Sequence, residues 1–295
     1  MTLTISIGAL ARALPRMPLA VLPTPLVPAP RLAEALGTGP LLVKRDDLTG
    51  FAFGGNKARL LEFLVAGLGC ELVIAGRAGP PGPALALARS WGAAVRWTGV
   101  PERDSVDTWL PAVAEKLTAQ GRRPYLIPRG GATGLGAVGY ALAAAELHEQ
   151  LAGRGLDGVT VVVPVGSGGT LAGLLAGHVL LGRPWALAGG SASRPPQAAA
   201  RQVLTLARDC LRLLGADREP GPADVTIVDA RGPGHGLPSP DGLAAAARAM
   251  RTEGLMLDPV YTAKALALAP PGQPVVFWHT GGVLDAVAAA QEAAP

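Results

Sequence analysis

A lysine at the start of a predicted helix has the surroundings that covalent chemistry requires. The segment KRDDLTGFAFGGNKARLLEFL, residues 44–64, predicts a strand with two acidic residues, a glycine-rich turn and then Lys57 at the helix start. The positive end of the helix dipole opposes an ammonium charge and favours the neutral amine, which is the form that makes a Schiff base. The same spacing fits a solvated lysine on a surface helix, so the spacing alone leaves both interpretations open.

A loop rich in glycine follows another apolar run. The segment VVVPVGSGGTLAGLLAG, residues 161–177, predicts a strand, a turn and a helix. Consecutive backbone N–H groups at a helix N-terminus suit a phosphate dianion, and glycines allow its close approach. The loop matches neither the Walker motif nor GxGxxG, and a tight turn between buried elements explains it equally well when it is taken alone. The candidate phosphate-binding residues are Gly166, Ser167, Gly168, Gly169 and Thr170.

Two later segments add hydroxyl groups and another glycine turn. In EGLMLDPVYTAKAL, residues 253–266, Tyr261 and Thr262 follow a strand-like run and an Asp-Pro pair. A hydroxyl pair at the end of an element can act on a ligand, although a plain structural tyrosine fits this position just as well. The segment PVVFWHTGGVLDA, residues 274–286, predicts a strand, a glycine turn and a helix start. Such turns at the carboxyl ends of parallel strands are where open α/β sheets bind ligands.

The composition predicts a folded protein of one large domain or two smaller ones. The 295 residues are 49% apolar and 16% charged, which excludes a disordered chain. The net charge of +4 comes from scattered basic residues, which argues against a nucleic-acid-binding surface. Cys70 and Cys210 lie far apart without histidine partners, so neither a disulfide framework nor a structural metal is expected. The first arginine follows the apolar N-terminal stretch, the reverse of a secretory signal, so we expect a cytoplasmic location.

Short β-branched runs alternate with Ala/Leu-rich stretches along the chain. This alternation predicts an α/β fold in which parallel strands are covered by helices. We expect strands at Leu41–Lys44, Leu72–Ala75, Ala94–Thr98, Tyr125–Pro128, Val159–Val163, Ala186–Gly190, Val225–Val228 and Val275–His279. We expect helices at Lys57–Gly67, Pro83–Trp91, Val106–Gln120, Gly136–Gln150, Thr170–Leu181, Pro196–Leu214, Ser239–Glu253 and Thr262–Leu268.

One apolar segment is long enough to span a bilayer. Residues 158–182 contain no Lys, Arg, Asp or Glu. Pro164 and the glycines that follow it would break a helix at the centre of this segment. We therefore predict a buried strand, a turn and a buried helix rather than a membrane span.

Taken together and in order, these segments resemble the fold type II pyridoxal-phosphate (PLP) enzymes, specifically the D-cysteine desulfhydrase and 1-aminocyclopropane-1-carboxylate (ACC) deaminase family. The resemblance covers most of the chain and includes LPTPLVPAPRLAEALG, GRRPYLIPRGGATGLGAVGYALAAAEL, SASRPPQAAARQV and GPGHGLPSPDG. It implies a tryptophan synthase β-like fold with parallel sheets in two domains, PLP as the cofactor and a homodimer. The large, PLP-binding domain would comprise residues 1–50 and 140–295, and a reduced small domain would be inserted at residues 51–139.

The resemblance assigns roles to the residues that match the family's motifs. Lys57 would be the Schiff-base lysine and the base that moves the Cα proton, and Asn56 beside it would bind the cofactor. The Gly166–Thr170 loop would hold the phosphate, and Tyr261 would face the substrate as an acid/base group or nucleophile. Thr262 matches the position opposite the pyridine nitrogen, where ACC deaminases carry a glutamate. A neutral hydroxyl leaves the ring nitrogen largely unprotonated, so we expect α,β-elimination or β-replacement rather than ring-opening deamination.

Two departures from the family's pattern concern substrate recognition. After the position of Ala75-Gly76, the family normally has a Gln-Ser-Asn-His turn, which clamps the substrate carboxylate. Here residues 77–97 read RAGPPGPALALARSWGAAVRW, so the clamp is missing, together with roughly one βα unit of the small domain. In GPGHGLP the family's usual tyrosine is replaced by His235, which either exchanges protons at the site or lies in a solvent-facing loop.

These residues predict a PLP-dependent lyase-type enzyme that acts on an amino acid or an amino-acid-derived intermediate, with Lys57, Tyr261 and His235 as catalytic residues. The missing clamp predicts a substrate other than D-cysteine or ACC, such as an intermediate of specialised metabolism. Two alternatives stay open: γ-replacement, cyclisation or C–C bond formation with the same cofactor, and a non-catalytic scaffold. We expect no metal, nucleic-acid or membrane partner.

Overall fold

A six-stranded sheet forms the centre of the molecule in the computed structural model, which describes residues 6–65, 72–74, 83–90, 92–100 and 105–292. The strand order is β1-β2-β8-β5-β6-β7, in which β1 runs antiparallel to β2 and all other neighbours are parallel. The strands are β1 (Leu26–Pro28), β2 (Leu41–Arg45), β5 (Thr160–Val165), β6 (Ala186–Ser191), β7 (Thr226–Asp229) and β8 (Val275–His279). The expected α/β fold with a largely parallel sheet is confirmed.

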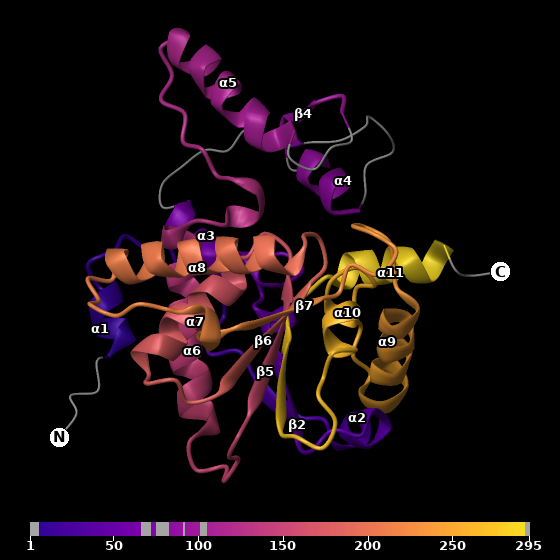
Figure 1. The fold of residues 1–295 in the computed structure, drawn as a ribbon. Helices are drawn as coiled ribbons and strands as arrows, with labels where there is room; N and C mark the ends of the chain where they lie inside the picture. Colours follow the sequence, from indigo (N-terminus) through magenta and orange to yellow (C-terminus); the bar gives the residue numbers. More distant parts are fainter. Residues whose placement is uncertain (1–5, 66–71, 75–82, 91, 101–104, 293–295) are drawn as a thin grey trace.

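Helices cover both faces of this sheet (Figure 1). One face packs on α1 (Ile7–Ala11), α3 (Lys57–Leu64), α6 (Gly134–Leu151), α7 (Gly169–Leu180) and α8 (Pro196–Leu213). The other face packs on α2 (Pro30–Leu36), α9 (Pro240–Glu253) and α10 (Thr262–Leu266). Along β5, Val161 and Val163 enter the first core and Val162 enters the second. Burial on both faces explains why this strand is a continuous apolar run in the sequence.

The apolar segment at residues 158–182 forms the predicted strand, turn and helix. Every residue of α7 is buried, and glycines bring it into close contact with α6. A Cβ atom at Gly173 would lie 2.1 Å from the carbonyl oxygen of Ala137, and one at Gly177 would lie 2.4 Å from the Cβ of Ala144. Within the described residues, no helix is both long enough and apolar enough to cross a membrane.

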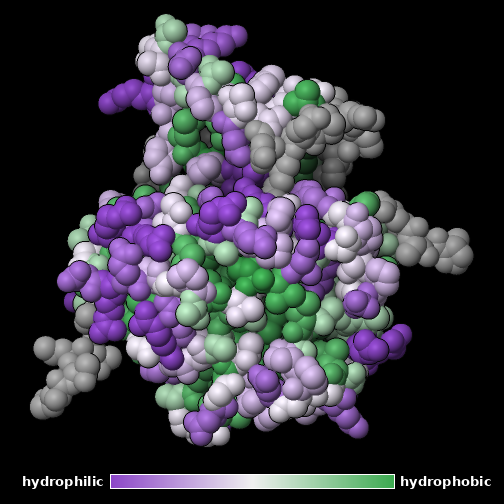
Figure 2. All heavy atoms as spheres, in the orientation of Figure 1, coloured by the Kyte–Doolittle hydropathy of each residue, from purple (hydrophilic) through white to green (hydrophobic). Residues whose placement is uncertain are grey.

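A smaller group of elements lies beyond one edge of this body. It contains the parallel pair β3 (Leu72–Ile74) and β4 (Val95–Trp97) with α4 (Pro83–Ser90) and α5 (Ser105–Ala119). Figure 1 places α4, β4 and α5 above the main sheet, and Figure 2 shows a narrow waist between this upper part and the larger body.

The domain boundaries and the missing βα unit stay predictions. Helix α3, which the prediction assigned to the small domain, packs on α6 and adds Leu60 and Phe63 to the core beside the main sheet. Residues 75–82, where the family's Ser-Asn-His turn would fall, lie outside the described residues, as does Cys70. Cys210 is a buried free thiol in α8.

The strand predicted at Tyr125–Pro128 is not formed. Residues 122–128 have no regular secondary structure, and the Tyr125 side chain is exposed. Pro124 and Pro128 have no N–H group to donate to a neighbouring strand, which explains why this apolar stretch does not join a sheet. Two helices and a strand were missed, namely α1, α2 and the edge strand β1, whereas α11 (Val283–Glu292) forms at the helix start predicted after the glycine turn of residues 274–286. The other predicted elements are present, with ends shifted by a few residues.

Candidate active site

A cleft opens at the carboxyl ends of β2, β5 and β8. The loops that follow these strands contribute Gly54–Lys57, Gly166–Gly168 and Thr280–Gly282 to its walls. Its volume of about 560 Å³ lies within the range of roughly 300–1,000 Å³ that is typical of small-molecule and cofactor sites. This is the position at which open α/β sheets bind ligands. Further described residues of the wall are Arg129, Gly130, Thr170, His235, Asp258, Tyr261 and Asp285.

Lys57 is the first residue of α3, and its side chain lines the cleft. Its Nζ donates a hydrogen bond to Asn56 Oδ1 at 3.2 Å. The amine is accessible from the cleft, but the protein around it removes much of its hydration and lowers its pKa from 10.5 to about 8. A neutral, nucleophilic amine is therefore available near physiological pH.

The Gly166–Thr170 loop and the first turn of α7 form another part of the wall. Gly168 precedes α7 with a φ of 97°, a left-handed conformation that favours glycine, and provides no side-chain cap for the helix. A Cβ atom at Gly166 would lie 3.1 Å from Tyr261 Cε1, so glycine allows the tyrosine ring to approach the loop. The uncapped N–H groups and the positive end of the α7 dipole make this loop suitable for an anion.

Tyr261 and His235 meet on the cleft wall. The Tyr261 hydroxyl lies 3.3 Å from His235 Nε2, within reach of a hydrogen bond. The loop that carries His235 is held by Lys264 of α10, whose Nζ donates to the carbonyl oxygen of Arg231 at 2.7 Å. The structure therefore places the two predicted proton-exchanging groups side by side.

Thr262 is buried behind the wall, and Asp258 lies on the cleft in front of it. The Thr262 hydroxyl donates to the Asp258 carboxylate. The same carboxylate accepts the backbone N–H groups of Tyr261 at 2.6 Å and of Thr262 at 2.9 Å, so it caps α10 and fixes Tyr261. Asp258 was not predicted as a site residue, although an aspartate just before a helix start is a typical signal for a cap.

Two further charged residues on the wall, Arg129 and Asp285, were not predicted as site residues. Arg129, in the short helix η2 (Arg129–Gly131), pairs with Asp107 of α5, with 2.9 Å between Nη2 and Oδ2. Asp285 lies in the first turn of α11, and burial together with the negative charge of Asp258 raises its pKa. Both residues lie in segments that were singled out in the sequence, but their positions on the cleft wall depend on the folded chain.

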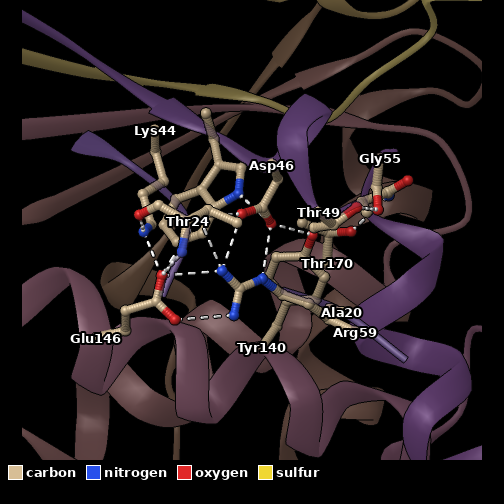
Figure 3. A network of polar contacts seen from close by, with 12 residues as sticks. Ala20, Thr24, Lys44, Asp46, Thr49, Gly55, Arg59, Tyr140, Glu146 and Thr170 are labelled. Atoms are coloured by element: carbon tan, nitrogen blue, oxygen red, sulfur yellow. Dashed lines mark hydrogen bonds and ion pairs between the residues drawn. The ribbon is translucent and has the colours of Figure 1, made fainter. Parts of the chain in front are cut away.

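A buried network of charged residues surrounds Asp46 and Arg59 (Figure 3). Asp46 accepts hydrogen bonds from Arg59 Nε and Nη2, both at 3.0 Å, from the Tyr140 hydroxyl at 2.6 Å and from Trp278 Nε1 at 2.9 Å. Burial alone would raise the pKa of Asp46, but the charge of Arg59 and these hydrogen bonds hold it below its ordinary value. Asp46 therefore stays ionised although it is fully buried.

A second carboxylate, Glu146, and a second cation, Lys44, complete this network. Glu146 accepts hydrogen bonds from Arg59 and forms an ion pair with Lys44. With Asp46, the set comprises two carboxylates and two cations, so its charges balance. Its members come from β2, α3, α6 and the segment that follows β2.

Hydrogen bonds continue from this network to the cleft. The Tyr140 hydroxyl interacts with that of Thr170, which accepts from Asn56 Nδ2 at 2.9 Å. Asn56 Oδ1 in turn accepts from Lys57. The position of Lys57 relative to the Gly166–Thr170 loop is therefore set by a continuous chain of side-chain contacts.

These features fit a cofactor that carries both an aldehyde and a phosphate. The amine of Lys57 supplies a nucleophile of lowered pKa, and the glycine loop with the α7 N-terminus supplies an anion site in the same cleft. PLP carries both of these functional groups. The fold and the cleft thus define a PLP-type enzyme on an open α/β scaffold.

Comparisons with known proteins identify the family. The family described as "Pyridoxal-phosphate dependent enzyme" matches residues 65–281. D-cysteine desulfhydrase from Yersinia enterocolitica is 34% identical over 91% of this chain and 94% of that protein. A relative from Pyrococcus abyssi, named provisionally as an ACC deaminase, is 34% identical over 94% of both chains. A crystal structure of an ACC deaminase homologue has a TM-score of 0.87 and 28% identity, and covers 99% of this chain and 98% of that one.

The chain therefore belongs to the PLP-dependent enzyme family, and PLP is its cofactor. It is similar to D-cysteine desulfhydrases and to an ACC deaminase homologue over nearly its whole length. The predicted family, fold class, cofactor and enzyme class are confirmed. The roles of individual site residues stay predictions.

We expect Asp46→Asn to lower the free energy of unfolding by about 3–5 kcal/mol, because it leaves Arg59 buried beside an uncharged partner. The matched control is Asp209→Asn, which removes an exposed pair with Arg212 and should change stability by less than about 1 kcal/mol. Urea denaturation of the PLP-free protein measures both variants. Equal effects of the two substitutions would contradict the importance assigned to Asp46.

Loading of PLP onto Lys57 should accelerate as the pH rises through about 8 and level off above it. The neutral amine is the reacting form, and a lowered pKa means that deprotonation is nearly complete about one unit above 8. The rate at which visible absorbance develops after PLP is added to the PLP-free protein measures this dependence. A rate that keeps rising with pH up to 10.5 would identify an ordinary hydrated lysine.

Proposed function

We propose that the protein catalyses α,β-elimination or β-replacement on an amino acid or an amino-acid-derived intermediate. The main support for this proposal is that one cleft is lined by Lys57, the Gly166–Thr170 loop and the Tyr261–His235 pair. These are a nucleophilic base, an anion-binding loop and a proton donor, which are the groups that such a reaction needs.

The bound cofactor would supply an electron sink that makes the Cα proton of an attached amino acid acidic. Lys57 would accept that proton, a task that suits an amine with a pKa of about 8. Tyr261 would deliver a proton to the departing group at Cβ, and His235 would return a proton to the tyrosine across their 3.3 Å contact. Asn56 would orient Lys57, and the Gly166–Thr170 amides would hold the phosphate.

The surroundings of Thr262 favour elimination over ring-opening deamination. The side chain at this position is neutral, and its hydroxyl is taken up by Asp258. Asp258 in turn is occupied by the N–H groups at the start of α10. We therefore assign no dedicated carboxylate to the ring nitrogen, which leaves a weaker electron sink suited to a substrate with a good leaving group.

The substrate that we propose differs from D-cysteine and ACC. The family's carboxylate-binding turn is absent from the sequence that follows Gly76, and His235 replaces the family's usual tyrosine. A cleft of about 560 Å³ has room for a larger amino-acid-derived molecule. Membership of an enzyme family and the position of Lys57 in the cleft favour this function over a non-catalytic scaffold. The homodimer and the cytoplasmic location stay predictions.

Product analysis of the PLP-loaded protein tests the function. We expect keto acid and ammonia from at least one D- or L-amino acid that carries a leaving group at Cβ, and little sulfide or pyruvate from D-cysteine. D-cysteine turnover of about 1–1,000 per second, typical of ordinary enzymes, would contradict an altered substrate. A product that retains the amino nitrogen without replacement at Cβ would indicate cyclisation or γ-replacement instead of the proposed reaction.

Substitution of Lys57 by alanine should abolish the visible absorbance that the protein acquires with PLP, because no amine then remains to bond the aldehyde. The matched control is Lys116→Ala, which removes an exposed lysine on α5 and should leave the absorbance unchanged. Absorption spectra of both variants after removal of free PLP measure the difference. Retained absorbance in Lys57→Ala would show that another amine holds the cofactor.

A further inference from the structure

The cleft wall carries a second cationic side chain besides Lys57. Arg129 lines the cleft and begins η2, directly before Gly130. Gly130 has a φ of 70°, and a Cβ atom there would lie 2.5 Å from Ser167 Oγ and 3.9 Å from Lys57 Cε. The backbone next to Arg129 therefore lies close both to Lys57 and to the Gly166–Thr170 loop.

Arg129 has the chemistry of a carboxylate-binding residue. Its guanidinium is a cation and presents N–H groups in the planar array that matches a carboxylate. Among the described residues of the wall, the other charged groups are Lys57, which we assign to the cofactor, and the acids Asp258 and Asp285. An anionic group of a substrate would be attracted to Arg129 and repelled by the two aspartates.

One partner of Arg129 is itself a carboxylate, which the carboxylate of a ligand can replace. Asp107 of α5 contacts Arg129 Nη2 at 2.9 Å, and its side chain is 47% exposed, against 23% for that of Arg129. An ion pair with a half-exposed partner contributes little stability, so its exchange for a ligand carboxylate costs little. The contact with Asp107 therefore shows that a carboxylate fits beside the Arg129 guanidinium, and the weakness of this ion pair lets another carboxylate take its place.

We infer that Arg129 binds a free carboxylate of the substrate and takes over part of the recognition for which the family uses the missing turn. This inference rests on the proposed function and adds a substrate class to it. The substrate is an amino acid whose carboxyl group is unmodified, rather than an ester, an amide or a thioester attached to a carrier.

Ligand binding to the PLP-loaded protein tests this inference without relying on turnover. The probes are D- and L-alanine and serine, each compared with the amine that lacks the carboxylate, ethylamine or ethanolamine. Dissociation constants come from the change in visible absorbance on titration. We expect the wild-type protein to bind at least one amino acid more tightly than its amine. Arg129→Gln should reduce that preference by about 10–100-fold, as expected for the loss of a charge-assisted hydrogen bond.

Two further variants separate ligand binding from a structural role of the ion pair. Arg129→Lys keeps the charge but not the planar array, and should keep part of the preference. Asp107→Asn breaks the same ion pair from α5 but leaves the arginine in place, and should keep or strengthen the preference. Equal losses in Asp107→Asn and Arg129→Gln would overturn the inference, because they would assign the effect to the contact between α5 and η2.

The remaining outcomes distinguish this inference from the function on which it rests. Visible absorbance in the wild-type protein with an unchanged preference in Arg129→Gln would overturn the role of Arg129 alone. A wild-type protein that binds none of these amino acids more tightly than the matching amine would overturn it as well. A wild-type protein without visible absorbance after PLP loading would overturn the proposed function and this inference together.

Discussion

One buried carboxylate, Asp46, holds in place the helix that carries Lys57. Its charge is balanced by Arg59, which follows Lys57 by two residues in α3, and it also accepts hydrogen bonds from Tyr140 in α6 and Trp278 in β8. A buried charge that loses its partners is costly, so these elements hold one another in place. Lys57 therefore reaches the cleft from a helix whose placement is fixed by contacts on its buried side.

The centre of the main sheet was predictable because β5 and β8 are buried along their whole length. Such strands are continuous apolar runs in the sequence, and β5 and β8 were found for this reason. The same rule failed at Tyr125–Pro128, an apolar stretch flanked by two prolines that have no N–H group to donate to a neighbouring strand. Strand β1 was missed because its three residues are too few to form a pattern, and its antiparallel pairing with β2 depends on how the chain returns to the sheet.

The candidate site was predictable where a local pattern carries the chemistry. Lys57 and the Gly166–Thr170 loop each belong to a strand, turn and helix in succession, and both line the cleft. Arg129, Asp258 and Asp285 were not found, because their roles come from neighbours that only the folded chain provides. Arg129 meets Asp107 across the waist, and Asp285 comes close to Asp258 because α11 and α10 both begin at the cleft.

The glycine contacts between α6 and α7 also limit which parts of the cleft wall can move. Gly173 and Gly177 bring the two helices so close that neither can slide or rotate against the other without a collision. The first turn of α7, with the adjoining Gly166–Thr170 loop, is consequently held firmly against the larger body. By contrast, the pair between Asp107 of α5 and Arg129 is half-exposed, and a pair of this kind contributes little to stability.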